Sequence, residues 1–212
     1  MVKLIIVRHG YSEANKANLF CGQHDVPLDE KGTIQAKEVS EYIKNNYNVS
    51  AIYSSDLCRA YYTLQPLSDS IGVPIVKDKE LREIDVGEWC GLSVEEAAEK
   101  FPETFRLYKE NPWKSRFEGG EGYADVQKRA MCALARIKEK HDGETVAIVT
   151  HGGVVRTLLA ELMHASLDDA KNIPHVANAS ITLADWDGEK AELTAIGYCD
   201  FLSEKTINSW VK

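Results

Sequence analysis

The sequence predicts an α/β fold, a three-layer α/β/α sandwich with a mainly parallel central sheet and a small helical cap insertion. Short apolar runs typical of buried strands alternate with segments of helical periodicity along most of the 212 residues. Two of the runs end in histidine followed by glycine, at residues 9–10 and 151–152. Ligands of such sheets bind outside the carboxyl ends of the strands, so these two ends are candidate parts of one site.

The element boundaries follow from periodicity and from residues that start or stop each element. Apolar or β-branched runs bounded by polar residues or glycine predict strands at residues 4–7, 51–54, 73–76, 145–149, 181–184 and 192–196. Apolar residues spaced three or four apart predict helices that begin after Asp29 and span 57–71 and 123–137, and a further helix is expected to follow Gly153 and continue through Leu162. Asp29 and Asp56 are predicted N-caps, and Asp187-Gly188 is the predicted turn of a terminal antiparallel pair.

Composition bounds the class of protein. Apolar residues make up 44% and charged residues 27%, which is typical of a globular domain, and we expect a single domain over residues 1–212. A formal net charge of −8 disfavours a protein whose whole surface binds nucleic acid or anionic lipid, but it allows a small positive pocket. The first apolar run is too short for a signal peptide or a membrane span.

The five cysteines are scattered, odd in number and without a Cys-x-x-Cys pair. This pattern disfavours a disulfide framework or a zinc site, and the histidines and acids show no metal-ligand spacing either. We therefore expect a reduced, cytoplasmic protein without a metal or other cofactor, and without a nucleic-acid or membrane partner. A homodimer is one assembly that the sequence leaves open.

Four segments carry residues suited to phosphate chemistry. Arg8 offers a fork of donors to a tetrahedral anion, and His9 is a candidate nucleophile, although the triplet with Gly10 alone is equally consistent with a structural strand end. Arg59 is expected in the first turn of a helix, where free N–H groups add positive charge. His151 repeats the placement of His9 at a strand end, and Glu83 is one of several acids that are candidate proton donors.

The ordered set of motifs resembles the histidine phosphatase superfamily, the phosphoglycerate-mutase-like proteins, over nearly the whole chain. The motifs are Val7-Arg8-His9-Gly10, Asn15, Phe20-Cys21-Gly22, Pro27-Leu28 with Gly32, Ser54-Ser55-Asp56-Leu57-Cys58-Arg59-Ala60, Leu81-Arg82-Glu83, Gly120-Glu121 and Val149-Thr150-His151-Gly152.

The resemblance implies a role for each matching residue. His9 takes the phosphoryl group as a phosphohistidine, while Arg8, Arg59 and His151 surround the phosphate oxygens. Glu83 protonates the leaving oxygen and then accepts a proton from the attacking water. Asn15 adds a hydrogen bond, and the pocket lining includes Cys21, Gly22, Gln23, Gly152 and Gly153.

The family contains phosphatases and mutases, and departures from the mutase pattern favour a phosphatase. Mutases usually have Arg and a Tyr-Gly pair after the glutamate, and Gly-Asn after the second histidine. This chain has residues 84–87 of sequence Ile-Asp-Val-Gly and the pair Gly152-Gly153 instead. We expect a metal-independent phosphomonoesterase for small phosphorylated metabolites. The alternatives are a cofactor-dependent phosphoglycerate mutase, an α-ribazole phosphatase of cobalamin synthesis, and a non-catalytic protein that binds phospho-ligands.

The cap-like insertion is expected at about residues 88–120, and most of its aromatic residues are interpreted as a small satellite core, with one or two facing the pocket. These aromatic residues are Trp89, Phe101, Phe105, Tyr108, Trp113 and Phe117. Of the remaining histidines, His24 is close in sequence to the pocket loop. The other three, His141, His164 and His175, are interpreted as surface or packing residues.

Overall fold

The computed structural model describes residues 1–207 of the chain. Its strands are β1 (Val2–Arg8), β2 (Ala51–Ser54), β3 (Ile75–Lys77), β4 (Thr145–Thr150), β5 (Ile181–Trp186) and β6 (Ala191–Tyr198). Its α-helices are α1 (Glu13–Ala17), α2 (Glu30–Asn46), α3 (Cys58–Ile71), α4 (Val94–Lys100), α5 (Pro102–Glu110), α6 (Tyr123–Lys140), α7 (Gly152–Leu162) and α8 (Leu167–Ala170). Single helical turns are η1 (Lys79–Leu81), η2 (Gly87–Trp89) and η3 (Pro112–Lys114).

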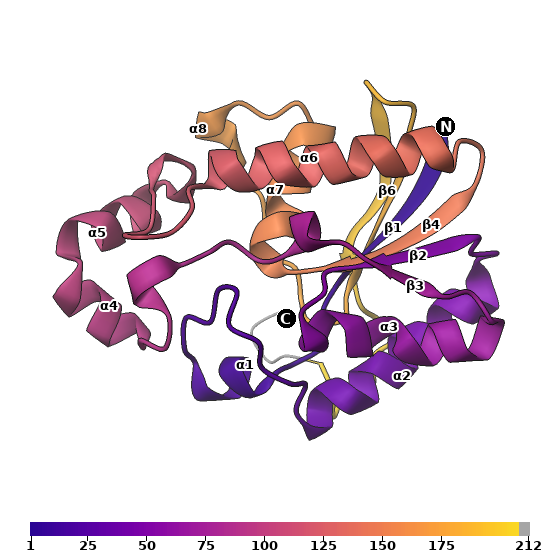
Figure 1. Cartoon of the computed structure of the whole chain (residues 1–212), viewed down its shortest axis with the longest axis horizontal. Coiled ribbons are helices and arrows are strands. Elements are labelled where there is room, and N and C mark those ends of the chain that lie inside the picture. The colour runs from indigo at the N-terminus through magenta and orange to yellow at the C-terminus, as the bar shows by residue number, and fades with distance from the viewer. Residues whose placement is uncertain (208–212) are drawn as a thin grey trace.

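The strands form one sheet in the order β3-β2-β4-β1-β5-β6. β3, β2, β4 and β1 run parallel, whereas β5 pairs antiparallel with β1 and β6 pairs antiparallel with β5. Figure 1 shows α2 and α3 on one face of the sheet and α6 and α7 on the other. The predicted three-layer fold with a mainly parallel sheet is therefore confirmed.

Strand β1 illustrates how the two halves of the core form. Its side chains alternate, so Leu4 and Ile6 belong to the cluster that includes residues of α6 and α7. Ile5 and Val7 belong to the opposite cluster, with residues of α2 and α3. All four side chains are buried. Burial of each contributes roughly 1.5–3 kcal/mol, which explains why a continuous apolar run predicts this strand.

The third strand begins two residues later than the sequence predicts. Helix α3 ends at Gly72, which adopts a left-handed backbone with φ +74° and donates its N–H to the Ser68 carbonyl. Pro74 follows and has no N–H to donate to a neighbouring strand. Regular pairing therefore starts at Ile75.

One of the two predicted helix caps is correct. Asp29 caps α2, because its carboxylate accepts a hydrogen bond from the Gly32 N–H at 2.7 Å. Asp56 does not cap α3, and the prediction for it is wrong. The Asp56 carboxylate instead pairs with Arg82 at 2.6 Å. The Cys58 N–H at the start of α3 donates to Asp25, a carboxylate 33 residues earlier in the chain.

The segment between β3 and α6 contains α4 and α5 and projects beyond the carboxyl ends of the parallel strands (Figure 1). Its centre is Trp89, which is completely buried. The Trp89 ring stacks on Phe101 and Phe105 and meets Phe117 edge-on at 4.9 Å between ring centres. These contacts form the satellite core that the aromatic spacing predicts.

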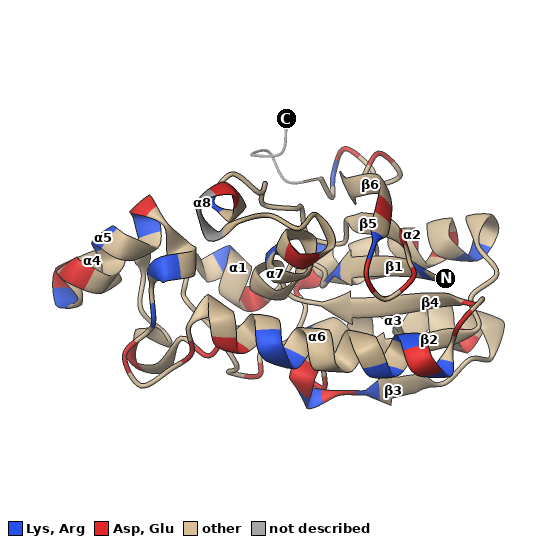
Figure 2. Cartoon of the chain, turned by 90° about the horizontal axis from the view of Figure 1, so that it is seen from above, with Lys and Arg blue, Asp and Glu red and all other residues tan. Residues whose placement is uncertain are grey.

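Acidic and basic residues are interspersed along α5 and α6 (Figure 2). None of the helices within residues 1–207 combines the length and the apolar character that crossing a membrane requires.

Candidate active site

The site begins where β1 and β4 end. These strands are parallel neighbours, and Arg8 is paired in register with Thr150. The next residue of each strand is therefore carried to the same edge of the sheet. His9 and His151 lie there with their ring centres 5.1 Å apart. The topology thus brings together two histidines that are far apart in the sequence, as the two histidine–glycine pairs predict.

The His9 ring is held in one tautomer. Its Nδ1 lies 2.7 Å from the Gly10 carbonyl oxygen, which can only accept a hydrogen bond. Nδ1 therefore carries the proton, and the neutral ring presents the lone pair of Nε2. Burial, followed by the charges of Arg59 and Arg8, holds the pKa of His9 well below its usual value. The neutral, nucleophilic form is thus the favoured one.

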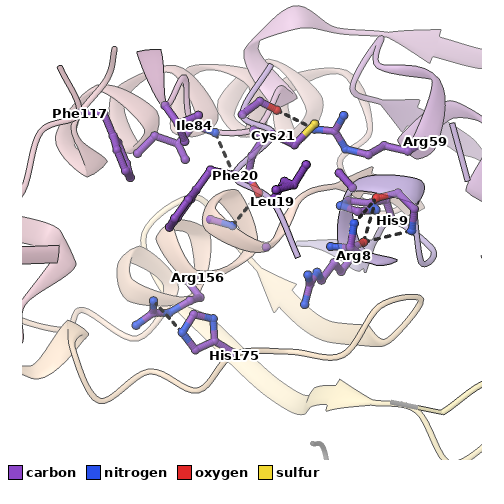
Figure 3. A pocket seen from close by; sticks show the side chains of 18 of the residues that line it. Arg8, His9, Leu19, Phe20, Cys21, Arg59, Ile84, Phe117, Arg156 and His175 are labelled. Atoms are coloured by element: carbon purple, nitrogen blue, oxygen red, sulfur yellow. Dashed lines mark hydrogen bonds between the residues drawn. The ribbon is translucent and has the colours of Figure 1, made fainter. Parts of the chain in front are cut away.

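Two arginines flank His9 (Figure 3). Arg59 lies in the first turn of α3 and is buried, and its guanidinium donates to the carbonyls of Gly22 at 2.7 Å and His24 at 2.9 Å. Arg8 donates to the Val176 carbonyl at 2.6 Å. Because carbonyl oxygens hold both forks, each arginine retains its positive charge for an anion.

His151 has a free ring nitrogen beside His9. Its Nε2 lies 2.8 Å from the Ser55 hydroxyl, which also accepts a hydrogen bond from the Leu57 N–H. The Ser55 proton is therefore available for Nε2, which leaves the proton of the neutral ring on Nδ1. Nδ1 has no partner among the described residues although it is buried. Burial and the Arg59 charge lower the pKa of His151 well below its usual value.

Glu83 follows η1 and faces the start of α7. Its carboxylate accepts hydrogen bonds from the Ile84 N–H at 2.9 Å and from the Gly153 N–H at 3.2 Å. A Cβ atom at position 153 would lie 2.5 Å from the carboxylate oxygen of Glu83. A side chain at position 153 would therefore displace the Glu83 carboxylate from its place beside the helix.

The main chain that carries Glu83 is held from α6. Arg129 forms a two-pronged ion pair with Glu121, with both N–O distances 2.9 Å. The same guanidinium donates to the carbonyls of Glu80, Arg82 and Glu83. Arg129 is not among the residues predicted from the sequence, where the Gly120-Glu121 motif that supplies its partner is the signal for it.

These residues enclose a pocket of about 200 Å³. Most of the residues singled out from sequence lie in its lining: Arg8, His9, Asn15, Cys21, Gly22, Arg59, Glu83, Gly152 and Gly153. His151 and Gln23 lie outside the lining. The Gln23 side-chain amide donates to the Glu83 carbonyl at 3.2 Å and so helps to hold the main chain of the acid.

Asn15 is the third residue of α1, a short helix that the sequence analysis did not predict. Its side-chain oxygen accepts hydrogen bonds from the Ser12 N–H and from Asn178. The Ser12 hydroxyl in turn caps α1 by accepting the Asn15 N–H. The Asn15 side chain is therefore held in place at the pocket wall.

The histidine interpretations need one correction. His141 is a packing residue, as expected, and contacts the Tyr53 hydroxyl at 2.9 Å. His175 is not merely a surface residue, because it lines the pocket together with Arg156. Arg156 is likewise not among the residues predicted from the sequence. The pattern that could have indicated it is its spacing, because it lies one helical turn after Gly152 on α7 and so on the same face of the helix.

Part of the pocket lining is apolar or aromatic. Two of the cap aromatics, Tyr108 and Phe117, belong to it, as the sequence analysis anticipated for one or two of them. Leu19, Phe20 and Ile84 are further apolar residues of the lining. Among the side chains that the structure describes, those of His, Cys, Asp and Glu do not gather into a group of three or more that could hold a metal ion.

Comparisons with known proteins point to one family. Residues 4–198 match the histidine phosphatase superfamily (branch 1). Phosphoserine phosphatase 1 of Hydrogenobacter thermophilus is 37% identical over 167 residues, which is 79% of each chain. The solved structure of Bacillus stearothermophilus YhfR has a TM-score of 0.89 and 32% identity over 95% of this chain and 99% of its own.

A second solved structure is similar over almost the same extent. It is the mycobacterial glucosyl-3-phosphoglycerate phosphatase Rv2419c in complex with VO3, with a TM-score of 0.86 and 27% identity. The alignment covers 93% of this chain and 99% of the mycobacterial one.

Proposed function

The chain belongs to the histidine phosphatase superfamily (branch 1) and is a phosphoric monoester hydrolase, and from this premise we propose that it works through a phosphohistidine on His9. The observation that carries the proposal is the tautomer of His9. Its Nδ1–H is held by the Gly10 carbonyl, so Nε2 presents a lone pair beside the guanidinium groups of Arg8 and Arg59. A basic nitrogen placed beside fixed positive charge suits attack on the phosphorus of a bound ester.

In the first step, the lone pair of His9 Nε2 attacks phosphorus in line with the ester oxygen. The new P–N bond forms as the P–O bond to the alcohol breaks, and protonated Glu83 gives its proton to the leaving oxygen. Arg8, Arg59 and the free Nδ1–H of His151 balance the charge of the equatorial oxygens.

In the second step, the Glu83 carboxylate accepts a proton from water as the water oxygen attacks phosphorus. The P–N bond breaks, its electron pair returns to Nε2, and orthophosphate leaves. Glu83 regains the proton that it lost, and His9 is neutral again. Two N–H groups already hold the Glu83 carboxylate at the pocket, which supports its role as the proton acceptor in this step.

Hydrolysis of p-nitrophenyl phosphate without added metal tests this mechanism. We expect the wild type to turn over and to carry an acid-labile phosphoryl label when quenched, and His9→Ala to lack both. Arg59→Met should lower kcat by roughly a hundredfold, since one lost donor to the transition state costs about 3 kcal/mol. Equal rates for wild type and His9→Ala would reject the mechanism.

The names of the relatives suggest the first natural substrate to test. We propose O-phosphoserine, because the Hydrogenobacter relative is called a phosphoserine phosphatase. Formation of serine and orthophosphate would support this choice. Interconversion of phosphoglycerates that depends on 2,3-bisphosphoglycerate would instead establish a mutase.

We place the protein in the cytoplasm. All five cysteines are free thiols, which supports a reducing compartment. The homodimer considered from sequence stays a prediction, and size-exclusion chromatography with light scattering tests it.

A further inference from the structure

The pocket has a second charged end, away from His9 and His151. Arg156 and His175 lie on the opposite side from His9 and Arg59 in Figure 3. All four residues line the same pocket. Arg156 projects from α7, and only 4% of its surface is exposed. The mechanism above uses no group at this end, so the position of a buried arginine there requires another explanation.

Arg156 lacks an acidic partner within the described part of the chain. Among the described side chains, which do not include those of residues 167 and 168, no ion pair involves Arg156, and its buried Nε has no hydrogen-bond acceptor. Its side-chain partners are neutral groups: the Nε2 of His175, which lies 3.4 Å from Nη1, and the hydroxyl of Tyr123. A buried cation is costly unless an anion is close, so an anion from outside the chain would stabilise this arrangement.

The surroundings of Arg156 orient it without neutralising it. Burial and the Arg156 charge lower the pKa of His175 to about 4, so its ring is neutral near pH 7 and can accept the guanidinium N–H. Tyr108 and Tyr123 line the same pocket, and the charge of Arg156 opposes the rise that burial causes in the pKa of each phenol. Two phenolic hydroxyls thus lie near the guanidinium.

We propose that Arg156 binds a carboxylate on the non-phosphate part of the substrate, so that the preferred substrates are small phosphomonoesters of carboxylic acids. A carboxylate matches the planar fork of one guanidinium and carries one charge, which one arginine balances. The pocket of about 200 Å³ lies below the roughly 300–1,000 Å³ of drug-sized sites, which favours a short acid. This inference rests on the proposed phosphatase function and adds its substrate class.

A matched pair of substrates tests the proposal. O-phosphoethanolamine is O-phosphoserine without the carboxylate, and both keep the phosphate and the ammonium group. In the wild type we expect kcat/KM for phosphoserine to exceed that for phosphoethanolamine by roughly 10- to 100-fold, the usual worth of a hydrogen-bonded charge pair. In Arg156→Met the ratio should fall close to one, mainly through the KM for phosphoserine. Arg156→Lys should give an intermediate ratio.

Arg106→Met is the control, since Arg106 is an exposed residue of α5 outside the pocket, and its ratio should equal that of the wild type. A wild-type ratio near one, or an unchanged ratio in Arg156→Met, would overturn the proposal. If Arg156→Met does not fold, the wild-type ratio of kcat/KM for phosphoserine to that for phosphoethanolamine tests the proposal together with Arg156→Lys. Absence of p-nitrophenyl phosphate hydrolysis by the wild type would instead reject the phosphatase mechanism itself.

Discussion

At the scale of single residues, the site depends on the fit between Glu83 and Gly153. The acid accepts the Gly153 N–H at the first turn of α7, where the free N–H groups of a helix attract negative charge. A glycine inside a helix normally lowers its stability by roughly 1 kcal/mol relative to alanine. The cost is tolerated here because a Cβ would occupy the space of the carboxylate.

Gly153→Ala separates these two effects. We expect the variant to remain folded, because alanine suits the helical backbone of α7, while kcat for p-nitrophenyl phosphate falls at least about tenfold as the Glu83 carboxylate is displaced. Activity assays combined with thermal unfolding check this result. Glu83→Gln is the comparison, and combining it with Gly153→Ala should add little further loss. Wild-type kcat in Gly153→Ala would show that the acid tolerates the methyl group.

At the scale of elements, α6 holds the acid-bearing loop in place. Arg129 connects this helix to three carbonyl groups of the loop and to Glu121, whose carboxylate also accepts the Asp85 N–H. Both side chains of the pair are mostly buried, with 16% and 21% of their surface exposed. A buried network of this kind positions Glu83 through the main chain rather than by touching the substrate.

Arg129→Met tests this positioning role. Breaking a buried pair by removing one partner costs about 3 kcal/mol, so we expect the free energy of unfolding to fall by that order. We also expect kcat to fall more than KM rises, because Glu83 shifts while the phosphate-binding arginines stay. Urea unfolding and steady-state kinetics measure the two effects.

Arg136→Met is the matched control for that experiment. Arg136 lies on the same helix and pairs with Asp78 and Glu80, but 55% of its side chain is exposed. An exposed pair contributes little, so its loss should cost less than about 1 kcal/mol. Similar losses of stability and kcat in both variants would contradict the positioning role of Arg129.

At the scale of the whole molecule, buried neutral histidines link stability to pH. Burial holds the pKa of His9 and His151 well below the usual 6.5. In the unfolded chain the same residues bind protons near pH 6.5. The unfolded state therefore takes up more protons as pH falls through this range, and the native state loses stability.

The free energy of unfolding should accordingly decrease from pH 7 toward pH 5, by up to about 1.4 kcal/mol per pH unit for each buried neutral histidine. Urea unfolding at several pH values measures the slope. His151→Asn should make the slope shallower. His164→Asn is the control at an exposed histidine with a left-handed backbone, which asparagine tolerates. Equal slopes in His151→Asn and the wild type would contradict the linkage.

Much of the fold could be predicted from sequence because its signals are local. The apolar runs of β1 and β4 and the spacing of α6 reflect burial on the faces of one sheet. A predicted helix cap was wrong where a polar side chain has several possible hydrogen-bond partners within reach. Asp56 has the chemistry of a cap, yet Arg82 pairs with it, and Asp25 supplies the acceptor for α3.

The sequence by itself determined which residues can carry phosphate chemistry and that two of them end buried strands, since strand burial and the chemistry of histidine are properties of short segments. It also predicted the family, because ordered motifs span the chain. Only the tertiary structure decided that Arg129 holds the Glu83 loop and that Arg156 and His175 form the second end of the pocket. Those contacts join segments distant along the chain, and their partners depend on packing in space, which no local pattern records.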